Sequence, residues 1–263
     1  MVRITTQKDL QSCGRLAFCY LCGKPFTDGE KQDRDHVPPR TIFLSGDRID
    51  PLVLPVHAVC NQGESREDEL VGQFVSALHQ KLPSPKRQRL KFITGRLKPD
   101  GQPFAFTANV PLAHIVWRWV RGFHAALYRE YLPESNKNFV RVPFPSGRRD
   151  GEKLIGDPIL PQHSFVPEEI KKNRIAKNLD VLSCCNGKCC YESVFVCADN
   201  GDPMCFWALR IYDWEKLAEQ RWVRSHGCIG GYLPPSGFPK GASKGTKLLF
   251  PFANNDLLNP FES

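Results

Sequence analysis

The sequence has no long apolar run and no export signal. Over its 263 residues we find no stretch of about eighteen uncharged apolar residues, the length that a membrane-spanning helix needs. The N-terminus, MVRITTQKDLQSCGRLAF, has neither the apolar h-region nor the small-residue cleavage site of a secretory signal. These absences argue against a membrane or secreted protein. We expect a soluble, cytoplasmic protein without an internal repeat.

Acidic residues are absent from residues 81–98, KLPSPKRQRLKFITGRLK, which contain seven Lys or Arg residues. Such a run is either a solvated basic linker or a surface that contacts a phosphate backbone, and both interpretations stay open. The whole chain carries a formal charge of +8, which favours an acidic partner through long-range attraction. Nucleic acid is the leading candidate partner.

Cysteine is abundant and present in an odd number, eleven residues in all. In a short secreted chain this count would indicate a disulfide framework, but this chain is long and has no export signal. Metal binding is therefore the preferred interpretation of the cysteines.

Two segments have the spacing of helices, and a 41% apolar content predicts a buried core. The first runs from about residue 58 to about 80 and ends before the breakers LPSP. The second, 111–132, opens with a proline, which the first turn of a helix tolerates. We expect its aromatic residues to be core rather than base-stacking: Trp117, Trp119, Phe123 and Tyr128.

The remaining segments are predicted as follows. Residues 1–18 form a short helix or arm. β-Branched and aromatic residues flank the turns NGK and NGDP, which predicts strands on both sides of each. The last forty residues, rich in Gly, Pro and Lys, are expected to have little regular structure.

Two ligand pairs predict a structural zinc site. Cys19 and Cys22 form a CxxC, and His57 and Cys60 form an HxxC at the start of the first predicted helix. An isolated CxxC is as easily a redox pair, but thiolates and a neutral imidazole at two such spacings can complete a tetrahedral zinc site.

The loop between the two pairs contains DRDHVPPRTIF. Asp35 and His36 belong to an extended segment because Pro38 disfavours a helical conformation in the residue before it. Consecutive side chains on a strand point to opposite faces, so these two share a centre only through a bulge or bend, or by flanking the positions of a metal and a substrate.

The order of CxxC, DHVPP and HAVCN resembles HNH endonucleases of the ββα-metal type, in the bacterial subgroup that embeds the hairpin in a zinc-binding treble-clef frame. The resemblance covers residues 19–69, with a weaker likeness at RGFHAALYREYLP. It implies that His36 is the general base for phosphodiester hydrolysis. Asp35 and Asn61 would hold one catalytic Mg²⁺ or Mn²⁺, and the zinc would be structural.

The sequence departs from this family at two points. His57 replaces the first cysteine of the second zinc pair, and imidazole is an acceptable zinc ligand. The middle asparagine, which orients the catalytic histidine, has no counterpart, and Asp50 is the nearest polar candidate.

Several further residues match the family less closely. Asp68 and Glu69 correspond to an acidic pair of the subgroup, although carboxylates near a helix start are commonly only dipole partners. Glu64 or Asp68 would contact the cation through water, and Arg40 would bind phosphate.

A second cysteine group, Cys184, Cys185, Cys189 and Cys190, lies around a tight turn near Cys197 and Cys205. These residues are either ligands of a second zinc or small residues buried in strands.

Together these features predict an α+β protein with three parts. They are an HNH nuclease module over 1–80, a basic linker and core helix over 81–132, and a C-terminal β-rich region over 133–263. The expected function is metal-dependent hydrolysis of DNA, in antiviral defence or a mobile element. The alternative is a non-catalytic treble-clef module that binds nucleic acid or a protein. A nuclease that needs a partner ATPase or sensor subunit would have the same sequence features.

Overall fold

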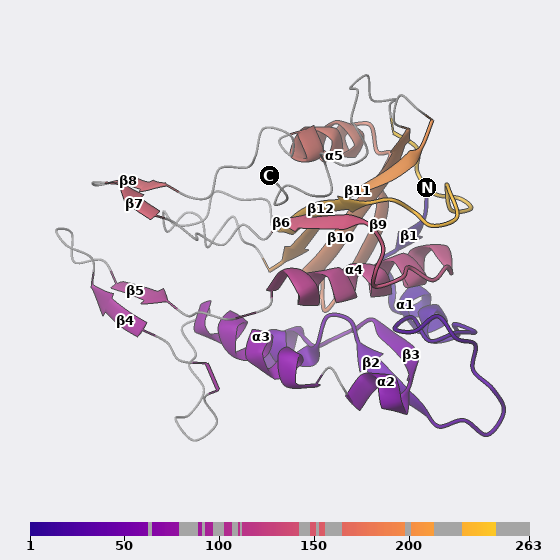
Figure 1. Cartoon of the computed structure of the whole chain (residues 1–263), viewed down its shortest axis with the longest axis horizontal. Coiled ribbons are helices and arrows are strands. Elements are labelled where there is room, and N and C mark those ends of the chain that lie inside the picture. Colours follow the sequence, from indigo (N-terminus) through magenta and orange to yellow (C-terminus); the bar gives the residue numbers. More distant parts are fainter. Residues whose placement is uncertain are drawn as a thin grey trace.

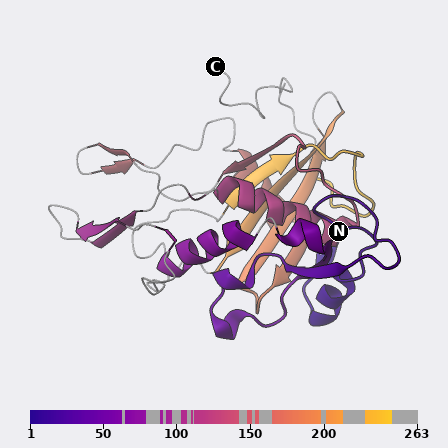
Figure 2. The same cartoon turned by 60° about the horizontal axis from the view of Figure 1, so that its bottom comes forward.

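The computed structural model describes residues 1–62, 65–78, 89–90, 93–96, 103–106, 110, 112–141, 148–150, 153–155, 165–197, 201–212 and 228–245. Helices and strands are mixed, as the sequence predicts. Figure 1 shows a large sheet covered by one helix on each face, with a small hairpin and its helices against the lower helix. When this lower part is turned forward, the small hairpin and its helices lie in front of the sheet (Figure 2). No helix among the described residues has the length and apolarity to span a membrane.

Among the described residues the large sheet has six strands, and the N-terminal strand β1 lies at one edge. In spatial order the strands are β1 (Arg3–Ile4), β9 (Asp180–Cys184), β10 (Cys189–Cys197), β11 (Pro203–Ile211), β12 (Cys228–Tyr232) and β6 (Asn138–Arg141). Only β1 and β9 run parallel, whereas the other neighbours are antiparallel. Segments from both ends of the chain therefore form one sheet.

Both faces of the sheet are apolar, so each needs a cover. In β10, Tyr191 and Phe195 belong to the hydrophobic core shared with α4 (Leu112–Tyr128), while Val194 and Val196 belong to the core under α5 (Phe165–Ile175). This is the alternation expected for a strand buried on both sides.

The strands predicted around the NGK turn are β9 and β10. Cys185, Asn186 and Gly187 have φ values of 54°, 54° and 73°, the left-handed conformation that such turns require. The strand predicted after NGDP is β11, which begins at Pro203, and residues 198–200 lie outside the described residues.

The prediction of little regular structure in the last forty residues is wrong for β12. Glycines weaken a strand signal, and this strand contains Gly230 and Gly231. A Cβ at Gly230 would lie 2.3 Å from the carbonyl oxygen of Phe139 and 2.4 Å from the ring of Trp207. The glycines thus permit a close approach to the rest of the sheet, which the sequence pattern does not reveal.

The helix predictions are largely confirmed. Residues 58–80 contain α2 (Ala58–Gln62) and α3 (Ser65–Leu78), and residues 1–18 contain α1 (Gln7–Cys13). The second predicted helix is α4, which ends at Tyr128 rather than at residue 132, because Arg129 has a φ of 59°. Its aromatic residues are buried, as expected. The sequence analysis did not identify β1, β6 or α5.

The hairpin module consists of β2 (Gln32–His36) and β3 (Val53–His57), paired antiparallel, with α2 directly after β3. The loop between the strands contains the 3-10 turns η1 (Arg40–Ile42) and η2 (Ser45–Asp47). Two further hairpins, β4 (Ile93–Arg96) with β5 (Pro103–Phe106) and β7 (Arg148–Asp150) with β8 (Lys153–Ile155), lie apart from it.

Helix α4 lies between the sheet and the hairpin module and is buried from Ile115 to Tyr128, including two arginines. Arg118 pairs with Asp68 of α3. Arg121 donates hydrogen bonds to the carbonyl oxygens of Leu132, at 2.9 Å, and Leu21, at 2.5 Å. A buried guanidinium is stable only with such partners, so both arginines fix the module against α4.

At Gly122, helix α4 packs closely against Val37, the first residue after β2. A Cβ there would lie 2.8 Å from Cγ1 of Val37, a buried β-branched residue that has little freedom to move. We expect Gly122→Ala to lower the melting temperature, because overpacking costs about 1–3 kcal/mol, more than the roughly 1 kcal/mol gained in helix propensity. The matched control is Gly46→Ala, where no atom lies within 4 Å of the added Cβ. Equal melting temperatures for both variants in thermal unfolding would contradict this contact.

Candidate functional site

Cys19 and Cys22 lie on a tight turn at the entry to the hairpin module. The Cys19 N–H donates to the carbonyl oxygen of Lys24 at 3.0 Å, and the Gly23 N–H donates to the carbonyl oxygen of Cys19 at 2.8 Å. Gly23 closes the turn with a φ of 77°, which glycine adopts without strain. The turn thus holds the first ligand pair in a compact knuckle.

The second ligand pair spans the junction of β3 and α2. His57 is the last residue of β3, and Cys60 lies in the first turn of α2. The ligand atoms of all four predicted residues lie within 4.8 Å of one another: Cys19, Cys22, His57 and Cys60. A tetrahedron with Zn–S bonds of about 2.3 Å has corners about 3.8 Å apart, so this cluster could bind a metal ion such as zinc.

The imidazole of His57 is oriented by its surroundings. Its Nδ1 lies 3.2 Å from Sγ of Cys22, and its Nε2 lies 3.3 Å from Oε2 of Glu30. The ring of Phe26 packs edge-on at 4.9 Å between centroids. A carboxylate behind a ligating histidine is a common second support for a metal site. Glu30 was missed in the sequence because no spacing rule points to it.

A pocket of about 320 Å³ lies at the end of the hairpin. It is lined by Arg34, Asp35, His36, Pro39, Arg40, Thr41, Asn61, Asp68 and Glu69. The structure therefore brings together the predicted trio and three of the residues that match the family less closely. We call it the trio pocket. Its residues come from β2, the loop after it, α2 and α3.

His36 is the last residue of β2 and is half-buried in the trio pocket. Burial, together with the nearby Arg40 cation, lowers the pKa of its imidazole, against the opposing effect of Asp35. The ring is consequently neutral near pH 7, the form that can accept a proton.

Asp35 is buried and is held by a residue of the knuckle. Its carboxylate accepts a hydrogen bond from the hydroxyl of Tyr20, which follows Cys19 directly. Burial and the neighbouring Asp35 charge raise the pKa of Tyr20 well above its usual value, so the phenol stays a donor. Tyr20 was not predicted as a site residue, although its position inside the CxxC could have suggested a role.

Asn61 lies in the trio pocket next to Cys60. Its amide nitrogen donates to Oδ2 of Asp33 at 2.8 Å. This bond, and the N–H of Arg34, lower the pKa of Asp33. An amide whose nitrogen is held by a carboxylate presents its oxygen on the other side, where it can bind a cation. The sequence analysis did not identify Asp33.

The acidic pair on α3 is engaged by arginines. Asp68 pairs with Arg118 of α4, and Glu69 lies 2.5 Å from Nε of Arg89. These ion pairs tie α3 to its neighbours. Glu64, the other predicted water-mediated contact, lies outside the described residues. Most of the basic run 81–98 also lies outside them.

Other predicted residues lie away from the trio pocket. Asp50, proposed to orient His36, lines a different cavity. His114 pairs with Glu67 and Glu134, and His124 is buried against the hydroxyl of Tyr232. His114 is thus a surface residue and His124 a core residue. The histidines at positions 79, 163 and 226 lie outside the described residues.

The second cysteine group does not form a metal cluster. Cys184, Cys185 and Cys189 are buried beside the α4 core, whereas Cys190 lies 3.5 Å from a guanidinium nitrogen of Arg210. In the described part of the chain, only the group with Cys19 has the geometry of a metal site. Burial raises the pKa of Cys189, which keeps it a neutral thiol. Of the two interpretations left open, this geometry favours burial of small residues, with Cys184 and Cys189 at strand ends and Cys185 in the turn between them.

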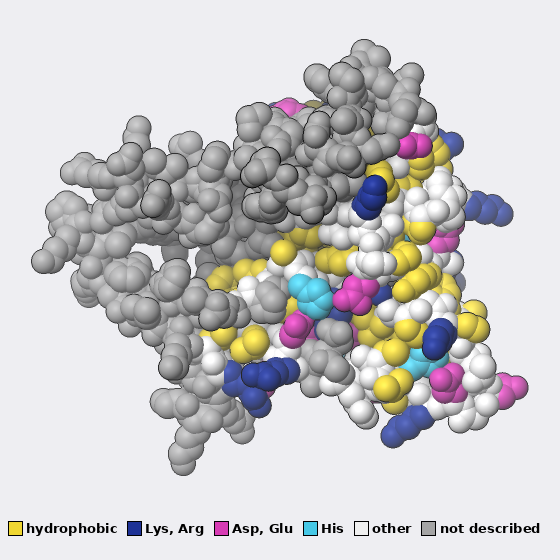
Figure 3. Space-filling view, in the orientation of Figure 1, with side chains coloured by type: hydrophobic (Ala, Val, Ile, Leu, Met, Phe, Trp, Pro, Cys, Tyr) yellow, Lys and Arg dark blue, Asp and Glu magenta, His cyan; other side chains and the backbone are white. Residues whose placement is uncertain are grey.

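Positive and negative side chains are mixed on the face shown in Figure 3. There, Lys, Arg, Asp and Glu side chains are interspersed among hydrophobic groups over the described residues.

Comparison of the chain with protein-family models, curated proteins and solved structures found no match. The site's own geometry therefore carries the functional argument.

Loss of one thiolate tests the metal cluster. We expect Cys22→Ser to lose the zinc that copurifies with the wild type and to lower the unfolding temperature, because a structural metal contributes folding free energy. The control is Cys197→Ser, a half-buried cysteine at the end of β10 outside the cluster. Zinc content is measured by elemental analysis alongside thermal unfolding. Wild-type zinc content in Cys22→Ser would contradict the assignment.

Proposed function

We propose that this protein is a metal-dependent endonuclease of the HNH type that hydrolyses DNA phosphodiester bonds. The observation that carries the proposal is the convergence of His36, Asp35 and Asn61 on one pocket beside the Cys/His cluster. A module that only binds nucleic acid needs the four metal ligands but has no need of this trio.

The local arrangement supports the family assignment. A cysteine knuckle, the β2–β3 hairpin and then α2 follow one another in the order of a zinc-binding treble clef that encloses a ββα unit. Each ligand pair is adjacent in sequence to a residue of the site: Tyr20 follows Cys19, and Asn61 follows Cys60. In the proposed enzyme, a structural zinc would therefore position both flanks of the trio pocket.

The trio provides hard oxygen ligands and a base. The carboxylate of Asp35 and the amide oxygen of Asn61 suit Mg²⁺ or Mn²⁺, which prefer oxygen donors. When bound, the cation would neutralise the charge that develops on the phosphate and the leaving oxygen. Tyr20 donates to Asp35 and restricts its orientation.

His36 performs the proton transfer in this proposal. Its neutral imidazole accepts a proton from the attacking water, whose oxygen forms the new bond to phosphorus while the bond to the leaving oxygen breaks. Arg40, exposed on the rim beside His36, is placed to bind a non-bridging phosphate oxygen. The mechanism uses one divalent cation.

The second candidate function is a non-catalytic zinc module that binds nucleic acid or a protein partner. The bond from Asn61 to Asp33 and the pairing of Asp68 with Arg118 favour it to a degree, since they show that polar residues near the pocket have structural partners. A nuclease that needs a partner ATPase or sensor subunit would share the same site.

Plasmid cleavage by purified protein tests the proposal. With Mg²⁺ or Mn²⁺ the wild type should nick or linearise the plasmid, and His36→Ala should be slower by about 10²–10⁴-fold, the usual contribution of a general base. His36→Ala should keep its zinc, unlike Cys22→Ser. The matched control is His114→Ala, which removes a histidine outside the trio pocket and should cut at the wild-type rate.

Two results would contradict the nuclease. The first is cutting by His36→Ala at the wild-type rate, which would assign the cleavage to another residue or a contaminant. The second is a zinc-replete wild type that binds DNA without cutting it, which would favour the binding module. Equal loss of zinc in His36→Ala and Cys22→Ser would contradict the division of roles.

A further inference from the structure

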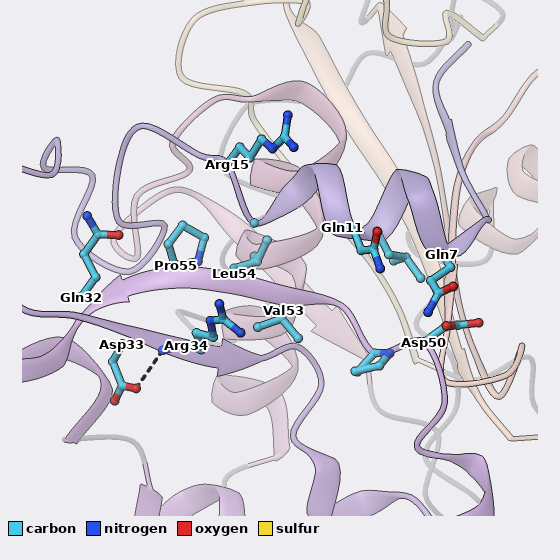
Figure 4. A pocket seen from close by; sticks show the side chains of 13 residues that line it. Gln7, Gln11, Arg15, Gln32, Asp33, Arg34, Asp50, Val53, Leu54 and Pro55 are labelled. Carbon is cyan, nitrogen blue, oxygen red and sulfur yellow. Dashed lines mark hydrogen bonds between the residues drawn. The ribbon is translucent and has the colours of Figure 1, made fainter.

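A second cavity of about 540 Å³ lies between α1 and the hairpin. It is lined by Gln7, Leu10, Gln11, Gly14, Arg15, Gln32, Asp33, Arg34, Asp50, Pro51, Val53, Leu54 and Pro55. We call it the α1 groove. Figure 4 shows Gln7 and Gln11 extending from α1 toward the hairpin, and Arg34 extending from β2 toward α1. Its volume is within the range of sites that hold small molecules.

The α1 groove and the trio pocket share one lining residue, Arg34. Gln32, Arg34 and His36 alternate along β2, so their side chains leave the strand on the same face. Gln32 and Arg34 line the groove, while Arg34 and His36 line the trio pocket. Arg34 is therefore common to both. In β2 this row of side chains leads from His36, in the trio pocket, to Gln32, in the groove.

The groove combines an apolar floor with hydrogen-bonding side chains. Pro51 and Val53, both half-buried, supply the apolar surface. Gln7 and Gln11 are four residues apart and share one face of α1, where each amide offers both a donor and an acceptor. Such amides can form paired hydrogen bonds with a base edge, whereas phosphate oxygens accept only.

The acidic residues of the groove also favour a base over a phosphate alone. Asp50 is an acceptor on the wall near Gln7, where a carboxylate would repel phosphate but can accept from an exocyclic amine. Asp33 points to the opposite side of the hairpin, where it accepts from Asn61. Arg34 is then the cation of β2 that can neutralise a phosphate between the two cavities.

We propose that the α1 groove holds a nucleotide next to the phosphate that is cut at His36. Gln7 and Gln11 read its base, and Arg34 binds the linking phosphate. This assignment rests on the proposed nuclease function and adds to it a determinant of sequence preference. The amides of α1, and not the trio, would then decide which positions of a nucleic acid are cut.

The double variant Gln7→Ala/Gln11→Ala tests whether these two amides recognise a base. Both residues are exposed on a helix, and alanine is a better helix former, so the fold should be retained. Cut positions on a plasmid are mapped by sequencing the ends that wild type and variant produce. The control is Lys171→Ala, an exposed cation on α5 across the sheet, which should leave the cut positions unchanged.

We expect the wild type to prefer one base beside the cut by about tenfold, and the double variant to lose most of that preference, as for one lost pair of base contacts. A double variant that cuts with the wild-type preference would overturn the groove's role, as would a wild type without any preference. Neither result contradicts the proposed nuclease function.

Failure of the nuclease itself is distinguishable. If the wild type does not cut, its affinities for four labelled oligonucleotides, each of a single base type, are measured by fluorescence anisotropy. These affinities test whether the α1 groove recognises a base. Base recognition without cleavage is supported if the wild type binds the four oligonucleotides with different affinities and Gln7→Ala/Gln11→Ala binds them equally. Equal affinities in the wild type, or a spread that the variant retains, would overturn it.

Discussion

The burial of α4 is the constraint on which the rest of the structure depends. The helix is covered from Ile115 to Tyr128, so it needs an apolar surface on both sides, and its buried Arg118 and Arg121 need fixed partners. The sheet supplies one surface. The hairpin module supplies the other, and the Leu21 carbonyl and the Asp68 carboxylate pair with the arginines. The C-terminal sheet thereby sets the position of the module.

The same contacts reach the candidate site. Gly122 lets α4 touch Val37, the residue after His36. Arg121 holds the knuckle at Leu21, next to the Tyr20 whose hydroxyl binds Asp35. The trio pocket is therefore supported from behind by the helix and from both flanks by the Cys/His cluster. A short hairpin alone would not order these groups, because a two-stranded hairpin in water is only marginally stable.

Three carboxylates of the hairpin module and α3 form hydrogen bonds or ion pairs within the protein. Asp33, Asp35 and Asp68 accept from Asn61, Tyr20 and Arg118, respectively. The net charge of +8 thus says little about the pocket itself. In the proposed nuclease, long-range attraction of a nucleic acid would be a property of the whole surface, whereas the proposed chemistry would depend on a few neutral or paired groups.

The sequence by itself determined the local elements of the site. The spacings of Cys19 with Cys22 and of His57 with Cys60, and the extended DHVPP segment, depend on neighbouring residues and were readable without a fold. Tertiary structure decided the rest. Tyr20, Asp33 and Arg118 act on residues 15 to 50 positions away, and β12 forms because Gly230 admits Trp207 and Phe139. Such contacts leave no periodic pattern, since each depends on packing between distant segments rather than on local conformational preference.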